Sequence, residues 1–86
     1  MGPEHISFPV EYPIKVIGRV LPGLRERIDE VFTRHFGVLH PHRVSERTSA
    51  QSSFVSFTYL IEVQAAAQLK PLHEELRALD GVIMVL

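Results

Sequence analysis

The sequence predicts an α+β fold: a ferredoxin-like split βαββαβ sandwich, in which two helices cover one face of a four-stranded antiparallel sheet. Two observations predict it. Hydrophobic periodicity along the 86 residues changes in the order strand, helix, strand, strand, helix, strand. Two strand–helix–strand units with right-handed crossovers then produce this topology. A generic α+β sandwich of other connectivity is the alternative. The length suits a single domain with a thin core.

The first 13 residues contain three prolines, a density that opposes a helix and favours an extended arm. We therefore assign an extended arm to residues 1–11 and one ferredoxin-like domain to residues 12–86. The first strand is expected over 14–20, where apolar residues alternate with lysine, isoleucine and arginine.

The first helix is expected to open at Pro22 and Gly23, since proline fits the first turn of a helix. Gly37 is a suitable end, because glycine tolerates the left-handed conformation of a helix cap. Arg25 and Asp29 are opposite charges four residues apart on the solvent side. The apolar stripe consists of Leu24, Ile28, Val31, Phe32 and His35.

The second and third strands form a predicted hairpin. Residues 38–48 form a weaker strand, and the proline at position 41 favours a sheet edge for it. The polar run 45–53 is typical of a hairpin tip. Residues 54–63 alternate most clearly and predict the third strand.

The second helix is expected over 65–79, with leucines at helical spacing. Pro71 requires its regular part to start near Gln68, because proline is tolerated only in the first turn. Residues 82–86 form a last, short, apolar strand, which is expected at the other edge of the sheet.

Helices cover only one face of such a sheet. Alternation assigns to the covered face Ile14, Val16, Val55, Phe57, Tyr59, Ile61, Val82, Met84 and Leu86. It assigns five large apolar residues to the open face: Ile17, Phe54, Leu60, Ile83 and Val85. Such residues predict a protein interface, most simply a homodimer. Pairing of edge strands is a second route to a dimer. The alternative to an interface is that these are scattered hydrophobic residues on the surface, covered in part by the arm.

Charge and residue types exclude several functions. The net charge of -1 does not favour nucleic acid or an anionic membrane. An RNA-recognition module stacks bases on aromatics of both central strands, but here only Phe54 is available and Lys15 stands at the other position. The chain has no cysteine and no asparagine, and no activated nucleophile or acid–base pair is evident. We expect no enzyme activity and no cofactor.

Histidines provide one weak metal candidate. His40 and His42 alternate on the second strand, and His35 is near them in sequence. The ligand set is incomplete, so surface histidines are the favoured interpretation.

No apolar run is long enough to span a bilayer, and the N-terminus lacks the form of a signal peptide. We therefore expect the protein in the cytoplasm, without a membrane partner.

The run Leu21-Pro22-Gly23-Leu24, followed by Ile28, resembles the loop-to-helix opening of ACT domains, which are amino-acid-sensing regulatory modules with this strand–helix order. The resemblance implies a ligand-binding loop at a dimer interface. Its residues here are Arg19, Leu21, Pro22, Gly23 and Leu24. Leu21 stands where these domains often carry an acidic or asparagine residue.

A broader resemblance covers residues 8–86. Phe8-Pro9, Lys15-Val16-Ile17-Gly18, Arg34-His35, Glu74-Glu75-Leu76 and Met84-Val85-Leu86 resemble the YbeD-like family of small bacterial proteins of unknown function, which has an ACT-like fold. The resemblance implies a cytoplasmic protein with a regulatory or adaptor role. Members are sometimes encoded beside lipoate-biosynthesis genes, so an amino acid or a lipoate-pathway compound is the implied small-molecule effector.

Overall fold

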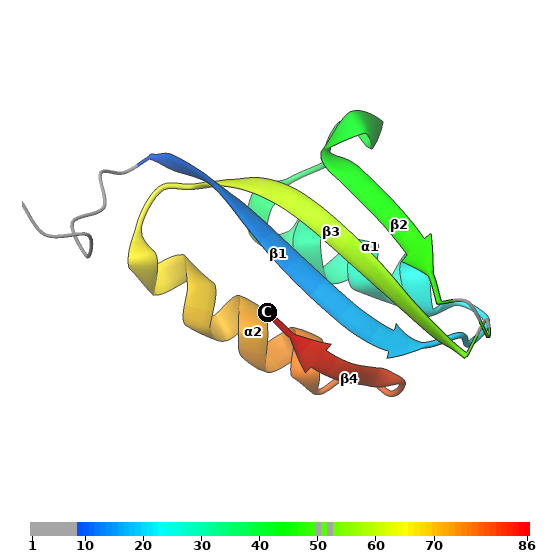
Figure 1. The fold of residues 1–86 in the computed structure, drawn as a ribbon. Helices are drawn as coiled ribbons and strands as arrows, with labels where there is room; N and C mark the ends of the chain where they lie inside the picture. Colours follow the sequence, from blue (N-terminus) through cyan, green and yellow to red (C-terminus); the bar gives the residue numbers. More distant parts are fainter. Residues whose placement is uncertain (1–8, 50, 52) are drawn as a thin grey trace, which may run out of the picture.

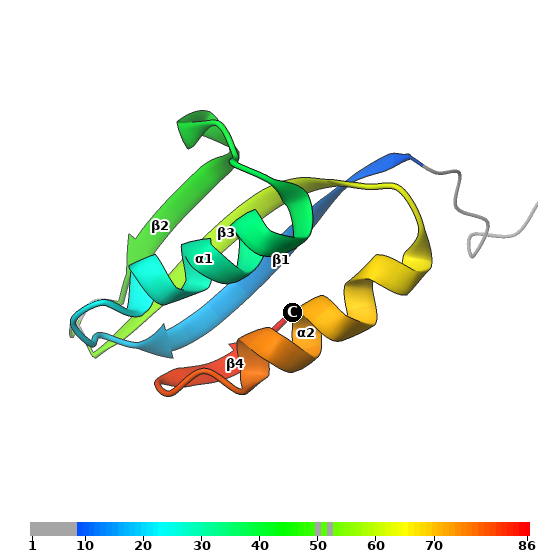
Figure 2. The same ribbon diagram turned by 180° about the vertical axis from the view of Figure 1, so that it is seen from behind.

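The computed structural model describes residues 9–49, 51 and 53–86. Its strands form a four-stranded sheet in the order β2-β3-β1-β4, and both α-helices lie on the same side of it (Figure 1, Figure 2). The predicted fold class is therefore confirmed. The elements are β1 (Val10–Arg19), α1 (Leu24–Phe36), η1 (Pro41–Arg43), β2 (Val44–Thr48), β3 (Phe54–Val63), η2 (Ala66–Gln68), α2 (Leu69–Arg77) and β4 (Val82–Val85).

The two central strands, β1 and β3, pair antiparallel along their whole lengths, from Val10 opposite Val63 to Arg19 opposite Phe54. β2 and β4 are the edges, as the sequence predicts. β1 starts earlier than expected, at Val10, so it includes the last two residues of the predicted arm. The arm's residues 1–8 lie outside the described part of the chain.

Pro13 lies within β1, although proline usually disrupts a central strand. Lys15 donates its backbone N–H to the Leu86 carbonyl and Arg19 donates its own to the Gly81 carbonyl, so the backbone N–H groups of these alternate β1 residues point toward β4. The backbone nitrogen of Pro13 points the same way, beyond the point where β4 ends. Its missing N–H therefore costs no bond within the described sheet.

The two connections into β2 and α2 use short 3₁₀ turns. The strand expected over 38–48 is only Val44–Thr48, because Pro41 starts a turn in which Arg43 donates its N–H to the His40 carbonyl at 2.9 Å. The helix expected over 65–79 becomes η2 followed by α2. Pro71 is the third residue of α2, in the first turn, as required.

The hydrophobic core lies between the sheet and the helices. β1 and β3 contribute every second residue, and α1 and α2 contribute their apolar stripes. The rings of Phe32 and Tyr59 stack at 3.9 Å with a 9° angle between their planes, which joins α1 to the middle of β3. The buried residues are Ile14, Val16, Leu24, Ile28, Val31, Phe32, Val55, Phe57, Tyr59, Ile61, Val63, Leu72 and Leu76.

β4 corrects one part of the prediction. A bulge lies between Ile17 and Gly18, so Val82 faces Gly18, Met84 faces Ile17 and Val85 faces Val16. One extra residue reverses the faces of all residues that follow it. The expectation that Val85 points outward was therefore wrong, and it packs against the core.

Met84 and Leu86, expected inside, are exposed instead. Leu86 pairs with Lys15 through two backbone hydrogen bonds of 2.8 and 3.1 Å.

Neither α1 nor α2, nor any other helix in the described residues, has the length and apolar character that a membrane span requires.

Candidate functional site

The side of the sheet away from the helices, here called the outer sheet face, is the candidate site. β1 and β3 each present alternate residues to it, and β2 adds Ser45 and Arg47, which pair with outward residues of β3. Its described members are Glu11, Pro13, Lys15, Ile17, Arg19, Ser45, Arg47, Phe54, Ser56, Thr58, Leu60, Glu62, Met84 and Leu86.

Cations outnumber carboxylates on the outer sheet face. Arg43, in the turn before β2, reaches over to Glu11 and places its Nη1 2.6 Å from the Oε2 atom. No other ion pair forms on this face within the described residues. The face therefore has a positive excess, whereas the whole chain has a net charge of -1. The cations without a carboxylate partner are Lys15, Arg19 and Arg47.

Large apolar side chains lie beside these cations. Phe54 is 47% exposed, Met84 46% and Leu86 57%, and Ile17 is half-buried between them. Of the five residues predicted for this face, the structure places Ile17, Phe54 and Leu60 there. Ile83 is exposed at the bulge, and Val85 faces the core.

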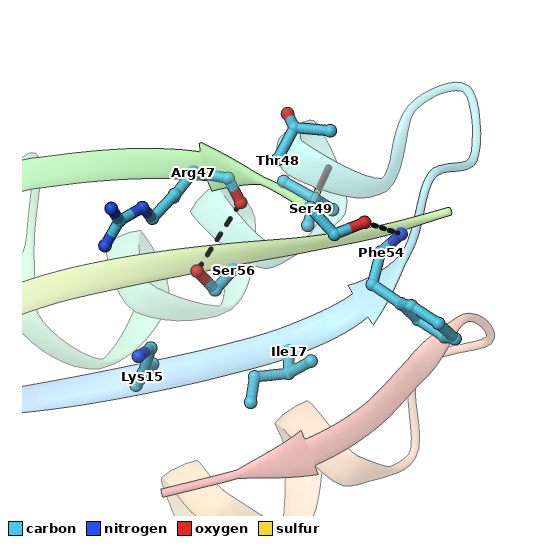
Figure 3. Close-up of a pocket in the computed structure, with 8 residues that line it drawn as sticks. Lys15, Ile17, Arg47, Thr48, Ser49, Phe54 and Ser56 are labelled. Carbon is cyan, nitrogen blue, oxygen red and sulfur yellow. Dashed lines mark hydrogen bonds between the residues drawn. The ribbon is translucent and has the colours of Figure 1, made fainter. Parts of the chain in front are cut away.

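A hollow of about 360 Å³ lies at the end of this face nearest the β2–β3 hairpin (Figure 3). Ser56 is opposite Ile17 on one side and opposite Arg47 on the other, so three strands meet there. Phe54 donates its N–H to Ser49 Oγ at 3.2 Å and accepts the Ser49 N–H at 2.8 Å. The lining is Lys15, Ile17, Arg47, Thr48, Ser49, Phe54, Val55 and Ser56.

The predicted ligand loop after β1 has a structural role. Leu24 is buried in the core, and Gly23 adopts φ 78° to start α1. The Leu21 side chain packs on the turn before β4, because a Cβ added at Gly81 would lie 2.7 Å from it. Pro22 accepts a hydrogen bond from Arg27 at 3.4 Å.

Two hollows adjoin this loop. One of about 150 Å³ lies between the loop and β2, and it is smaller than the usual ligand pocket. The other, of about 420 Å³, is lined by Arg19 and Leu21 and by the turn that contains Gly81. Ligand binding here stays a prediction.

The histidines do not gather into a ligand set. The rings of His40 and His42 lie 4.2 Å apart, and His40 Nδ1 accepts the His42 N–H. His35 instead contacts Glu75 at 2.7 Å. In the described residues, no three His, Cys, Asp or Glu side chains are grouped closely enough to hold a metal ion.

Glu75 links the two helices, a role that sequence periodicity did not reveal. Its carboxylate accepts His35 Nε2 at 2.7 Å and Arg34 Nη1 at 2.6 Å. The hydrogen bond from His35, and then that from Arg34, hold the pKa of Glu75 below its usual range.

A second polar network lies at the β2 side of α1. The Tyr59 hydroxyl donates to Asp29, and Arg25 contacts both Asp29 at 3.6 Å and Glu46 at 2.9 Å. Burial, and then the bond to Asp29, raise the pKa of Tyr59 far above its usual value. The hydroxyl therefore stays protonated and does not act as a base. The Arg25–Asp29 pair is the one predicted from spacing.

Comparison with known proteins places the chain among uncharacterised bacterial relatives. A family model described as "Protein of unknown function (DUF493)" matches residues 3–86. The UPF0250 protein of Ectopseudomonas mendocina is 40% identical over 85 residues, which cover 98% of this chain and 92% of that protein. The UPF0250 protein of Shewanella sediminis is 35% identical over 83 residues, 96% of this chain and 92% of that protein.

Two solved structures share the fold. The ACT domain of GTP pyrophosphokinase from Chlorobium tepidum superposes with a TM-score of 0.64 at 22% identity, covering 90% of this chain and 97% of that one. The C-terminal domain of the MgtC protein from Mycobacterium tuberculosis also has a TM-score of 0.64, at 17% identity, with 95% and 89% covered. These similarities support the ACT-like fold and nothing finer.

Proposed function

The chain belongs to the DUF493 family of proteins of unknown function, as the YbeD-like resemblance implied, and we propose that it is a non-enzymatic regulatory or adaptor protein of the cytoplasm. It acts by binding another protein through the outer sheet face. The observation that carries this proposal is the combination of exposed Phe54, Met84 and Leu86 with three cations that lack partners in the described residues.

The apolar residues support contact with a protein. A face covered by nothing would be expected to expose mainly polar groups, whereas these residues adjoin one another across β3, β1 and β4. Protein interfaces combine aromatic, methionine and arginine side chains in this way and disfavour lysine at their centre.

The chemistry of the face supports binding rather than catalysis. Two hydroxyl groups in the lining of the hollow, those of Ser49 and Ser56, are engaged with the backbone of Phe54 and Arg47. Among the described residues that line the hollow, none is a histidine or a carboxylate that could act as a base. The ACT-like fold also occurs as one domain of the enzyme GTP pyrophosphokinase. That occurrence is compatible with the proposal that this chain acts by binding another protein.

Site-specific photo-crosslinking tests the proposal. A photoreactive amino acid is placed at Phe54, or at Glu30 as the control, which is exposed on α1 on the other side of the molecule. We expect the probe at position 54, but not that at position 30, to crosslink one discrete protein in the cells that make this chain. The purified partner is then titrated against the wild type and Phe54→Asp.

The outcomes separate clearly. Loss of partner binding in a folded Phe54→Asp variant supports the proposal, and a crosslink to a second copy identifies the homodimer as the complex. Equal crosslinking from both positions, or unchanged affinity of Phe54→Asp, would contradict binding through the outer sheet face.

A further inference from the structure

The chemistry of the hollow on the outer sheet face indicates the kind of partner segment. Its apolar part is formed by Ile17 and Phe54, and its two cations, Lys15 and Arg47, come from strands on opposite sides of β3 (Figure 3). The volume of about 360 Å³ is at the small end for ligand sites. It accommodates one large side chain rather than a folded element.

Charge favours a different protein over a second copy as the occupant. In a two-fold contact the same surface meets itself, and each outer sheet face presents three cations without carboxylate partners in the described residues. Glu11 is already bound to Arg43, so Glu62 is the one described side-chain carboxylate of the face left to match them. Like charges placed together at an interface oppose association.

Charge alone would also suit RNA, but the aromatic content does not. Base recognition on an open sheet depends on aromatic side chains of two central strands. Phe54 is the one aromatic residue among the described members of this face. The carboxylates of Glu11 and Glu62 at the far end would repel a continuing phosphate chain.

We propose that the outer sheet face binds an acidic peptide segment of its partner, which inserts one large apolar side chain between Ile17 and Phe54 and places flanking carboxylates at Lys15 and Arg47. This inference rests on the proposed function and specifies the chemistry of the partner. Arg47 and Lys15 lie on either side of the β3 residues that they pair with, Ser56 and Thr58. Carboxylates on both sides of one apolar residue match that arrangement.

A random display library of 12-residue peptides, selected on the purified full chain, tests the inference without assuming a sequence. We expect enrichment of peptides with Asp or Glu next to Phe, Leu, Ile or Met. The charge-reversed variant Lys15→Glu/Arg47→Glu is compared with a matched control, Lys70→Glu/Arg77→Glu, whose residues are exposed on α2.

Affinity of a synthesised enriched peptide is then measured by fluorescence anisotropy. Reversal of the two outer cations should weaken binding about tenfold or more, since it removes two ion pairs and adds repulsion between like charges. The α2 control should bind within about twofold of the wild type. Binding should also weaken as salt is raised.

Three results overturn the inference: enriched peptides without acidic residues, no enrichment, or tighter binding of a 12-nucleotide oligouridine than of any enriched peptide. None of them decides the proposed function, because crosslinking from position 54 reports a protein partner of any charge. Conversely, if crosslinking fails but acidic peptides bind, the chemistry of the hollow stands and the cellular role does not.

Discussion

The inner and outer faces of β1 and β3 are formed by alternate residues of the same two strands, yet they differ in burial and in charge. Ile14, Val16 and Ile61 on the inner face are completely buried, and no charged residue is buried in the described part of the chain. One residue away along β1, the outer face carries Lys15, Ile17 and Arg19. The two helices account for the difference, since they cover one side only (Figure 2).

This contrast separates stability from recognition. Substitutions on the inner face should change the free energy of unfolding and affect binding only through folding. Substitutions on the outer face should change binding while the fold persists. Four experiments, in order of decreasing expected effect on stability, test that division.

The same substitution on opposite faces of β1 should have the largest and most unequal effect. Ile14→Ala removes a fully buried side chain and should lower the free energy of unfolding by about 3 kcal/mol. Ile17→Ala, at a half-buried outer position, should lower it by less than about 1 kcal/mol. Urea denaturation measures both, and similar losses would contradict the division between the faces.

Gly18 tests how closely the inner face is packed at the bulge. A Cβ at this position would lie 2.8 Å from Leu24 Cδ2 and 2.9 Å from the Gly81 carbonyl oxygen. Because that oxygen also accepts the Arg19 N–H at 2.8 Å, it cannot move freely. Gly18→Ala should cost about 2 kcal/mol, seen as a lower Tm by calorimetry. Unchanged stability would show that β4 packs less tightly than described.

Removal of a polar group on the helix side of the sheet should lower the free energy of unfolding by a smaller amount. Tyr59→Phe removes the hydrogen bond to Asp29 and should cost about 1 kcal/mol. The control is Tyr12→Phe, whose hydroxyl makes no hydrogen bond to another described residue and which should cost less than about 0.5 kcal/mol. If both variants unfold at the same urea concentration, the Asp29 bond contributes nothing.

Acid should weaken the link between the helices. Because the folded pKa of Glu75 is lowered, its contribution is complete above the ordinary glutamate pKa of about 4.3 and is lost as pH falls through the lowered value. Glu75→Gln should therefore reduce Tm at pH 7 and reduce it less at an acid pH below about 4.3, whereas the exposed neighbour Glu74→Gln should reduce it at neither. An equal Tm difference at both pH values would refute the assignment.

Alternation was a sound guide where strands are long. β3 buries every second residue along its length, and β1 does so from Ile14 onward, so the predicted inner and outer sets were right for both. The placement of Ile17, Phe54 and Leu60 on the outer face follows from that alternation alone.

Alternation failed in β4 because the bulge depends on contacts between residues distant in sequence. Gly18 approaches Gly81 from more than sixty positions away, and nothing local in 82–86 indicates this. The same limit applies to the cations. Alternation with Ile14 and Val16 is enough to place Lys15 and Arg19 on the outer face, but the contribution of Arg47 required the register of β2 against β3.

The pairing of β1 with β3 also has a consequence for the speed of folding. Arg19 meets Phe54 and Val10 meets Val63, so the partners are 35 to 53 residues apart in the chain. No bond between these strands can form until that long loop closes, and its entropy is lost before any contact compensates for it. The protein should therefore fold more slowly than a helical bundle of equal length, with the centre of its sheet as the late step.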